Sequence, residues 1–458
     1  MQALAAQKIA IVGRLVETSP DSVLSNLSRA LAETVDNSAL GDVRKLVEAE
    51  VVERQFRNAV MEPLTPMFVG VGNDSRKLTF PLAALPLIWR GLRSVAGVEL
   101  DDIRRIADAD PPHPGLSARY DRLVETAASE LRARINPEFA AAADLCDQAR
   151  PDGATELLAC MHIAGVVRRA ALVLPTWITH PGSESRLSAR PAYNDALAVS
   201  ESAGPYYFQM ISAQLEQCWM VLRIISAVIE KPTERYLDVA ELAGFAEALM
   251  EEVDEALTLI ATFDPEAGPG AGNAAAVRAE LAVRQIMEME TNVALNRDRG
   301  WGRRIQKQRR KLASAVEARL READLAVMAA LPMHEINQHG IRRTAPRLSC
   351  EPDAACVRRA ETLLSFSAGL RSAVNHGGFL AAWGALVEKL STVLDLYVDE
   401  TVRQIRLDQT GETACSEAFL DVAARFSHLV AGQKAGELVR RRAQAARHHE
   451  PQIAVNAD

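Results

Sequence analysis

The sequence predicts an all-α protein, either a multi-helix bundle or a stack of antiparallel helical hairpins, with several long helices. Three observations lead to this fold class. Apolar residues make up 48% of the 458 residues and aromatic residues only 5%, and the abundance of Ala, Leu, Arg and Glu favours helix. Apolar positions recur at helical spacing along most of the chain. No stretch shows the sustained alternation and β-branched enrichment of a half-buried strand.

Pro, Gly and Ser mark the breaks between the predicted helices. The longest break is 179–205, a Ser/Pro-rich stretch with few large apolar residues, which we expect to be a linker or long loop. It separates an N-terminal helical region, 1–178, from a C-terminal helical region with long amphipathic helices, 206–448. The polar residues 449–458 are expected to form a disordered tail. No repeat of fixed period indicates a solenoid.

Long helices are expected throughout the C-terminal region. Residues 206–230 are apolar nearly all round, as in a helix enclosed by neighbours. Asp238 and Glu241 have the spacing of a capping box, which predicts that a helix begins there and continues past Ile260. Two further helices are predicted from the apolar periodicity: 274–332, interrupted near Gly300 and Gly302, and 379–407.

The expected location is the cytoplasm. Lys8 and Arg14 interrupt the apolar residues at the start of the sequence, so they do not form a signal-peptide core. The apolar runs 78–89 and 157–167 are shorter than the roughly 20 residues that span a bilayer, so no transmembrane segment is expected. The cysteines are scattered, which favours reduced thiols over a disulfide framework; they are Cys146, Cys160, Cys218, Cys350, Cys356 and Cys415.

One group of side chains resembles a metal site. In "HEINQH" the histidines His334 and His339 stand five residues apart, roughly 140° around a helix, whereas a zinc-protease helix spaces them four apart. With Cys350 and Cys356 they form a looser set of possible zinc ligands, although their spacing matches no common structural site. The alternative is a pair of helix-end histidines and ordinary thiols.

Catalytic motifs are otherwise missing from the sequence. No nucleophile elbow and no complete phosphate-binding loop is present, so an enzyme is unsupported and no cofactor is expected. Catalytic groups can still assemble from distant positions, and the enzyme class therefore stays open.

The segment 297–311 carries eight basic residues against one acid, in a chain of formal net charge −8. If 301–323 is helical, one sector is apolar and includes Trp301, and the cations lie elsewhere around the helix. Opposite the apolar sector lie Arg303, Lys307 and Arg310. Arg304 and Lys311 lie on one flank, and Arg309 lies nearer the apolar edge.

Three interpretations of this basic segment compete. It can contact the phosphates of nucleic acid, lie on an anionic membrane with Trp301 near the headgroups, or pair with acids of this protein or of a partner subunit. The third is favoured, because the preceding residues 234–296 hold thirteen acids and three bases.

A second basic cluster precedes the tail. It comprises Arg440, Arg441 and Arg442, followed by Arg447, His448 and His449. Cations at the C-terminal end of a helix complement its dipole, which is the favoured interpretation. Binding of an anionic partner would gain support if both basic clusters shared one face.

These patterns predict a cytoplasmic helical scaffold or adaptor that acts through protein–protein contacts, with protein partners or self-association as an oligomer. The first alternative is a peripheral protein that binds nucleic acid or an anionic membrane through 297–311. The second alternative is a metalloprotein or enzyme centred on 334–356.

Overall fold

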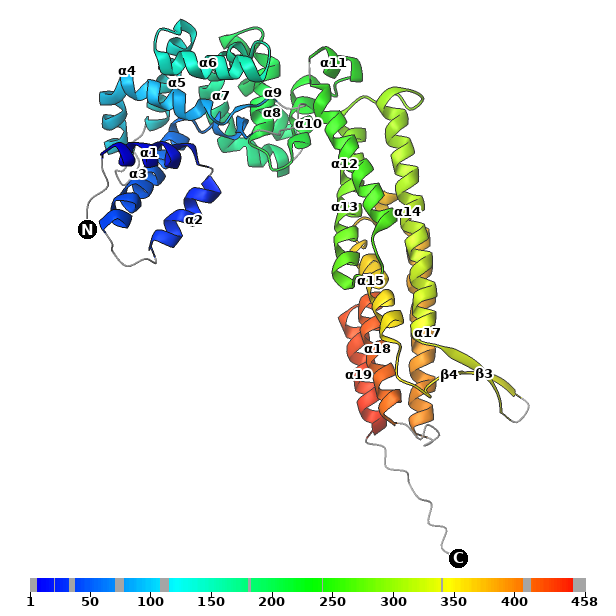
Figure 1. Cartoon of the computed structure of the whole chain (residues 1–458). Coiled ribbons are helices and arrows are strands. Elements are labelled where there is room, and N and C mark those ends of the chain that lie inside the picture. Colours follow the sequence, from blue (N-terminus) through cyan, green and yellow to red (C-terminus); the bar gives the residue numbers. More distant parts are fainter. Residues whose placement is uncertain are drawn as a thin grey trace, which may run out of the picture. The chain divides into compact units, whose positions relative to one another are not determined.

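The computed structural model confirms the all-α class (Figure 1). It describes residues 6–19, 21–32, 38–70, 78–107, 115–179, 183–240, 242–338, 341–406 and 413–447. Within these residues, 19 α-helices are joined by two short 3₁₀ turns and two two-stranded sheets. The predicted tail 449–458 lies outside the described residues.

The chain forms two compact units, Met1–Ala246 and Glu247–Asp458. The division falls inside one helix, α12 (Ala243–Thr262). The stretch 179–205, expected to be a linker or long loop, instead contains α8 (Ser183–Val199). Pro191 lies within this helix and Ala189 and Ala196 are buried on its inner side, so the small apolar residues, and not the abundance of Ser and Pro, decide the local structure.

The first unit is helical apart from one short parallel strand pair. Its remaining elements, in chain order, are α1 (Ala6–Thr18), α2 (Asp21–Ala32), α3 (Ser38–Val60), η1 (Thr65–Met67), β1 (Phe68–Val69), β2 (Phe80–Pro81), α4 (Ala84–Ala107), α5 (Leu116–Ala133), α6 (Pro137–Ala149), α7 (Gly153–Thr179), α9 (Ala203–Ala213), η2 (Cys218–Met220), α10 (Val221–Ile229) and α11 (Glu234–Val239). Phe68 pairs with Phe80 and Val69 with Pro81 in the strand pair.

Helix α7 is the central helix of the first unit and packs against α5, α6, α8 and α9. Its sequence places Cys160, Ile163, Ala164 and Val167 in the interior. The apolar run 157–167 does not end the helix, which continues to Thr179 and becomes long and apolar enough to cross a membrane. Of its most apolar 18-residue window, 56% is buried inside the protein, as in a core helix.

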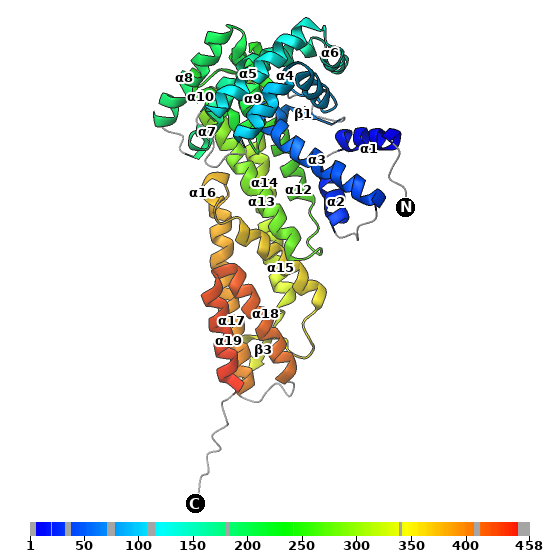
Figure 2. The same ribbon diagram turned by 90° about the vertical axis from the view of Figure 1, so that its left-hand side faces the viewer.

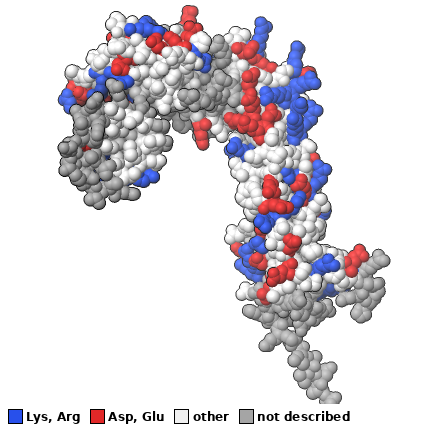
Figure 3. Space-filling model, viewed as in Figure 1, with Lys and Arg blue, Asp and Glu red and all other residues white. Residues whose placement is uncertain are grey.

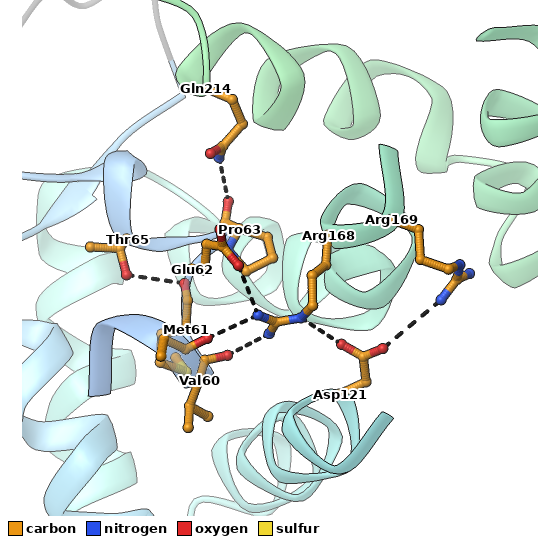
Figure 4. A network of polar contacts seen from close by, with 10 residues as sticks. Val60, Met61, Glu62, Pro63, Thr65, Asp121, Arg168, Arg169 and Gln214 are labelled. Atoms are coloured by element: carbon orange, nitrogen blue, oxygen red, sulfur yellow. Dashed lines mark hydrogen bonds and ion pairs between the residues drawn. The ribbon is translucent and has the colours of Figure 1, made fainter. Parts of the chain in front are cut away.

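Arg168 on α7 joins the end of α3 to α5 (Figure 4). Arg168 is buried, with 5% of the residue exposed. Its guanidinium donates to the carbonyl oxygen of Ala59 at 2.9 Å, to that of Val60, and to the Asp121 carboxylate at 2.9 Å. The guanidinium carbon of Arg168 also lies over the Tyr120 ring, 5.4 Å from the ring centroid. The last carbonyls of a helix have no partner inside the helix, so Arg168 satisfies groups that burial would otherwise leave unpaired.

Glu53 on α3 anchors α4 in a similar way. Its carboxylate accepts hydrogen bonds from the indole nitrogen of Trp89 at 2.6 Å, from Nε of Arg93 at 2.7 Å and from Arg104. The Arg104 guanidinium lies over the Phe56 ring, 4.7 Å from its centroid. One carboxylate therefore fixes three side chains of the neighbouring helix.

The second unit contains most of α12 and the elements that follow it. These are α13 (Pro269–Asn292), α14 (Gly300–Ala330), β3 (Met333–Gln338), β4 (Ile341–Pro346), α15 (Ala354–Gly369), α16 (Val374–Gly377), α17 (Leu380–Arg406), α18 (Thr413–Ala431) and α19 (Gln433–Arg447). Helices α12, α13 and α14 lie together at one end of the unit, and α17, α18 and α19 form a three-helix group at the other (Figure 2). Helix α15 packs against α13, α14 and α18 and so joins the two groups.

Close packing of α13 on α15 depends on small residues. Gly272 lies on α13 so near to α15 that a Cβ atom would overlap the carbonyl oxygen of Thr362, and Gly369 on α15 faces the methyl group of Ala276. Both helices keep small residues at this crossing, where larger side chains would hold the backbones apart. The Gly-rich start of α13 is therefore part of the core of the second unit.

Several predicted boundaries are corrected by the structure. The segment 206–230 is not one helix, because α9 ends at Ala213 and α10 begins at Val221. The capping box does not start a helix either: Asp238 lies within α11, α12 begins at Ala243, and Glu241 lies outside the described residues. The break predicted near Gly300 is present, since α13 and α14 are separate helices. The helix predicted at 379–407 is confirmed as α17.

A β-hairpin replaces the helix-end structure expected around His334. Strands β3 and β4 pair antiparallel, with Met333 opposite Pro346 and His334 opposite Ala345. Helix α17 packs against β4, and Ala345 is buried. This contact with α17 supplies tertiary stabilisation that a two-stranded hairpin needs in water.

Arginine side chains cap the C-terminal ends of several helices in both units. Each donates to one or more of the last backbone carbonyl oxygens of a helix other than its own, where the helix dipole is negative. The pairs are Arg54 with α1, Arg168 with α3, Arg223 with α7, Arg319 with α12 and Arg371 with α18.

Candidate interaction surface

Helix α14 is amphipathic, as the sequence predicted. Buried apolar side chains at helical spacing form its inner face. They are Ile305, Leu312, Val316, Leu320 and Ala323. Trp301 belongs to the same sector and is half-buried. The inner face packs against α15, α17 and α13, so the helix is held in place over most of its length.

Two of the predicted cations pair with acids of neighbouring helices. Arg304 reaches the Asp254 carboxylate on α12 at 2.8 Å, and Arg309 reaches the Glu290 carboxylate on α13 at 3.2 Å. Between them, Gln308 is 2% exposed and donates to the carbonyl oxygen of Met250 at 2.6 Å. These contacts hold α14 between α12 and α13, and the acids before residue 297 do cover the flanks of the basic segment.

The pKa of the Asp254 carboxyl is lowered by these neighbours. Burial alone would raise it, but hydrogen bonds from Gln308 and Arg304 and the charges of Arg304 and Lys311 outweigh burial. Asp254 is therefore a stable anion that fixes one edge of the basic segment.

The cations on the outward side of the segment differ from Arg304 and Arg309 in that none of them is in an ion pair. No ion pair within the described residues involves any of them, and all are exposed. We call this set the basic face, and it comprises Arg297, Arg299, Arg303, Lys307, Arg310 and Lys311. Figure 3 shows Lys and Arg side chains gathered over the beginning of α14.

A row of acids on α12 lies beside the basic face. Glu247, Glu251 and Glu255 are exposed and spaced four residues apart, so they occupy one side of the helix. We call this row the acidic stripe. Figure 3 shows acidic side chains over α12 directly next to the basic ones of α14. Counting acids over 234–296 did not locate this row, although the four-residue spacing was a signal that could have done so.

The second basic cluster lies away from the basic face. Arg440, Arg441 and Arg442 are exposed on the last turns of α19, and Arg442 pairs with Asp399 of α17 at 2.9 Å. The C-terminal end of α19 and the beginning of α14 lie at opposite ends of the second unit (Figure 1). The structure therefore does not bring the two clusters onto one face. His448 and His449 lie outside the described residues.

The possible zinc ligands are only partly described. His334 is exposed on β3, Cys350 is exposed after β4, and Cys356 lies in the first turn of α15, whose N-terminus is capped by Asp353. His339 lies outside the described residues. Over the described ranges, no three His, Cys, Asp or Glu side chains are close enough to hold a metal ion.

No disulfide joins any of the six cysteines, all of which lie within the described residues. Cys146, Cys160 and Cys218 are buried, as expected of thiols within helical patterns. Burial raises the pKa of the Cys146 thiol to about 12 and also raises the pKa of the Cys160 thiol.

Comparison of the chain with protein-family models, curated proteins and solved structures found no match.

Proposed function

We propose that this protein is a cytoplasmic helical scaffold or adaptor that acts through protein–protein contacts, and that the basic face is its contact surface. One observation carries the proposal. Two cations of the segment 297–311 are paired with Asp254 and Glu290, while four others lie exposed on the outward side of α14, which is fixed by its neighbours, and Arg297 and Arg299 lie exposed just before this helix.

A fixed row of charges favours specificity in association. Long basic side chains on a helix that is already ordered lose only their own rotamer freedom when a partner binds. Their charges also steer an acidic surface toward the correct orientation and accelerate encounter. These properties suit a recognition surface better than a catalytic one.

The acidic stripe favours a protein over a polyanion. A nucleic acid or an anionic membrane presents negative charge in all directions along its surface, and Glu247, Glu251 and Glu255 would be brought close to it. A protein surface can place acids opposite the basic face and bases opposite the acidic stripe.

The outward side of α14 also lacks the residues that membranes and single-stranded nucleic acids use. Trp301 is half-buried on the inner sector, so it is not on the side where the basic face would meet headgroups. No aromatic residue stands among the exposed cations for a base to stack on.

The cytoplasm suits the state of the cysteines. Three of the six are buried and the described cysteines form no disulfide, which fits a reducing compartment.

The test compares the immobilised full chain with a variant in which Arg303→Glu, Lys307→Glu and Arg310→Glu are combined. A matched control carries Lys434→Glu, Arg440→Glu and Arg441→Glu on α19, which makes the same change in net charge at exposed positions elsewhere. Proteins retained from a soluble cell extract are measured by quantitative mass spectrometry at physiological salt.

We expect a set of proteins that binds the wild type and the control and is lost with the basic-face variant. Equal retention by all three proteins would overturn the proposal. In parallel, salt-dependent binding of duplex DNA, RNA or acidic vesicles by the wild type and the control, lost with the basic-face variant and without any retained protein, would establish the polyanion alternative instead.

A further inference from the structure

We propose that the outward side of α14 binds an α-helix of a partner protein, and that one face of this partner helix is acidic toward one end and apolar toward the other. This inference rests on the proposed function and names the kind of partner. It follows from the order of the exposed residues along the whole of α14, of which the basic face covers only the beginning.

Most exposed residues of α14 lie in one straight row. From Arg303 to Met328 they recur three or four residues apart, and at about 100° per residue they fall within a sector of about 80°. The row is about seven turns long, or about 37 Å at 1.5 Å per residue, and lies opposite the buried residues of the helix. We call it the outward stripe, which comprises Arg303, Lys307, Arg310, Ser314, Ala318, Arg321, Leu325 and Met328.

The chemistry of the outward stripe changes along its length. Its beginning carries three cations of the basic face. Its end is apolar, with Leu325 69% exposed and Met328 37% exposed. Between the two ends the stripe passes through the small residues Ser314 and Ala318, where the backbone of another helix can approach closely.

The cations of the outward stripe remain available to a partner. None of them is in an ion pair within the described residues, in contrast to Arg304 and Arg309. Arg310 and Arg321 donate to carbonyl oxygens of α14 itself, at Gln306 over 3.4 Å and at Glu317 over 3.2 Å. A backbone carbonyl carries no net charge, so these contacts do not neutralise the arginines.

The spacing of the outward stripe favours a helix over an extended segment. A second helix presents one residue of a face about every 5.4 Å, whereas a strand places residues of one face roughly 6.6 Å apart. An extended segment would therefore lose register with the stripe within a few residues. Two helices that cross at about 20° keep their rows in contact over several turns.

Charge and polarity then fix the chemistry of the partner helix. Acidic residues opposite the cationic end set its orientation and accelerate its encounter. Apolar residues opposite Leu325 and Met328 remove those side chains from water. A uniform polyanion would satisfy the cationic end but would place its charges against the apolar end. The two ends together therefore select an amphipathic helix.

The experiment uses synthetic helices as probes. Two fluorescent peptides of about seven turns are held helical by a hydrocarbon staple on the side away from the contact face. Each has Glu on the contact face in one half and Leu on it in the other, and the two peptides place the acidic half at opposite ends, so that both directions of the partner helix are covered. A third peptide has the same composition, with Glu and Leu distributed around all sides.

Binding to the full chain is measured by fluorescence anisotropy at physiological salt. The basic-face variant and its charge-matched control on α19 test the cationic end. A second variant, Leu325→Gln with Met328→Gln, tests the apolar end. Its control is Leu396→Gln with Leu438→Gln, at leucines of α17 and α19 that are 49% and 52% exposed. Circular dichroism checks that each variant is folded.

We expect at least one striped peptide to bind the wild type and both controls. The basic-face variant and the Leu325/Met328 variant should each weaken this binding at least about tenfold, and the peptide without a stripe should bind the wild type at least about tenfold more weakly. Failure of both striped peptides to bind, or binding that is indifferent to the Leu325/Met328 variant, would overturn the proposal.

A membrane surface is tested with the same variants. Vesicles of phosphatidylcholine and phosphatidylserine are floated with the full chain. Vesicle binding that requires both ends of the outward stripe, while neither striped peptide binds, would assign the stripe to a membrane and overturn the helical partner.

These outcomes separate the two proposals. If neither striped peptide binds but extract proteins still depend on the basic face, the helical partner is wrong and the scaffold function stands. If a striped peptide binds through both ends but extract proteins are indifferent to the basic face, the scaffold function is wrong and the affinity of the outward stripe for a helix stands.

Discussion

Arg319 of α14 donates from Nε to the carbonyl oxygen of Ile260 at 3.0 Å and thereby caps the C-terminal end of α12. One of its terminal nitrogens, Nη2, donates to the carbonyl oxygens of Ala261 at 2.5 Å and Phe263 at 3.1 Å. The guanidinium lies 4.4 Å from the centroid of the Phe263 ring. The buried residue Arg319, 8% exposed, thus replaces the water that would otherwise solvate the helix terminus.

Replacing this arginine should destabilise the second unit strongly. We expect Arg319→Met to lower the free energy of unfolding by about 3 kcal/mol, because several buried carbonyls lose their donor while the aliphatic volume is kept. Arg321→Met, at an exposed position two residues later, should change it by less than about 0.5 kcal/mol. Urea denaturation of both variants measures the difference, and similar values for the two would contradict the capping role.

Two glycines of α13 should respond in opposite directions to the same substitution. Gly272→Ala brings a methyl group against the backbone of Thr362 and is expected to cost about 1–3 kcal/mol by forcing α13 and α15 apart. Gly270→Ala meets no atom within 4 Å and should stabilise by up to about 1 kcal/mol through helix propensity. Thermal unfolding of the pair tests this, and equal shifts of the same sign would show that the crossing is less tight than described.

The stability of the first unit should depend on pH through Glu53. Burial would raise the pKa of its carboxyl, but hydrogen bonds from Arg93, Arg104 and Trp89 outweigh burial and lower it from 4.5 to about 2. A lowered pKa adds stability above the unfolded-state value, and this stability is lost as the pH falls from about 4.5 to about 2.

We therefore expect Glu53→Gln to destabilise the protein by about 3 kcal/mol at neutral pH. The gap between wild type and variant should close as the pH is lowered through this window. Denaturant unfolding at a series of pH values gives the measurement, with Glu48→Gln, exposed on the same helix, as the control. A gap that does not change with pH would contradict the proposed charge network.

The thiols should react in an order set by burial. A maleimide added to the native protein at pH 7.5 is expected to modify Cys350 first, because it is exposed. Cys146 and Cys160 should react only after unfolding, since burial removes access and the raised pKa of each leaves almost no thiolate. Mass spectrometry of digests taken over time follows the order, and early labelling of Cys160 would show that α7 is accessible.

The fold class and the amphipathic pattern of α14 could be predicted from the sequence because both are periodic properties of neighbouring residues. The inner residues from Ile305 to Ala323 are buried as predicted. Helix boundaries were harder, because they depend on competition between local signals and packing. Asp238 has a capping spacing, yet the chain continues in α11 and begins α12 only at Ala243. Pro191 resembles a break but is accommodated within α8.

The basic face could be located in the sequence only as a cluster of cations. Which of them are neutralised depends on contacts across three helices, and Arg304 and Arg309 are paired only because Asp254 and Glu290 lie on packed neighbours. The hairpin around His334 was missed for a related reason. The strand pairing of 333–338 with 341–346 is supported by packing of β4 against α17, which begins only at Leu380.

The arginines that cap helix ends also change the net charge at the protein surface, because their own charges are buried. Among the described residues, the charged side chains buried in the protein are Arg54, Arg57, Arg168 and Arg319, and no carboxylate is buried with them. The groups available for contact are therefore more acidic than the formal net charge of −8 indicates. An anion-exchange resin should therefore retain the folded protein more strongly than its composition predicts.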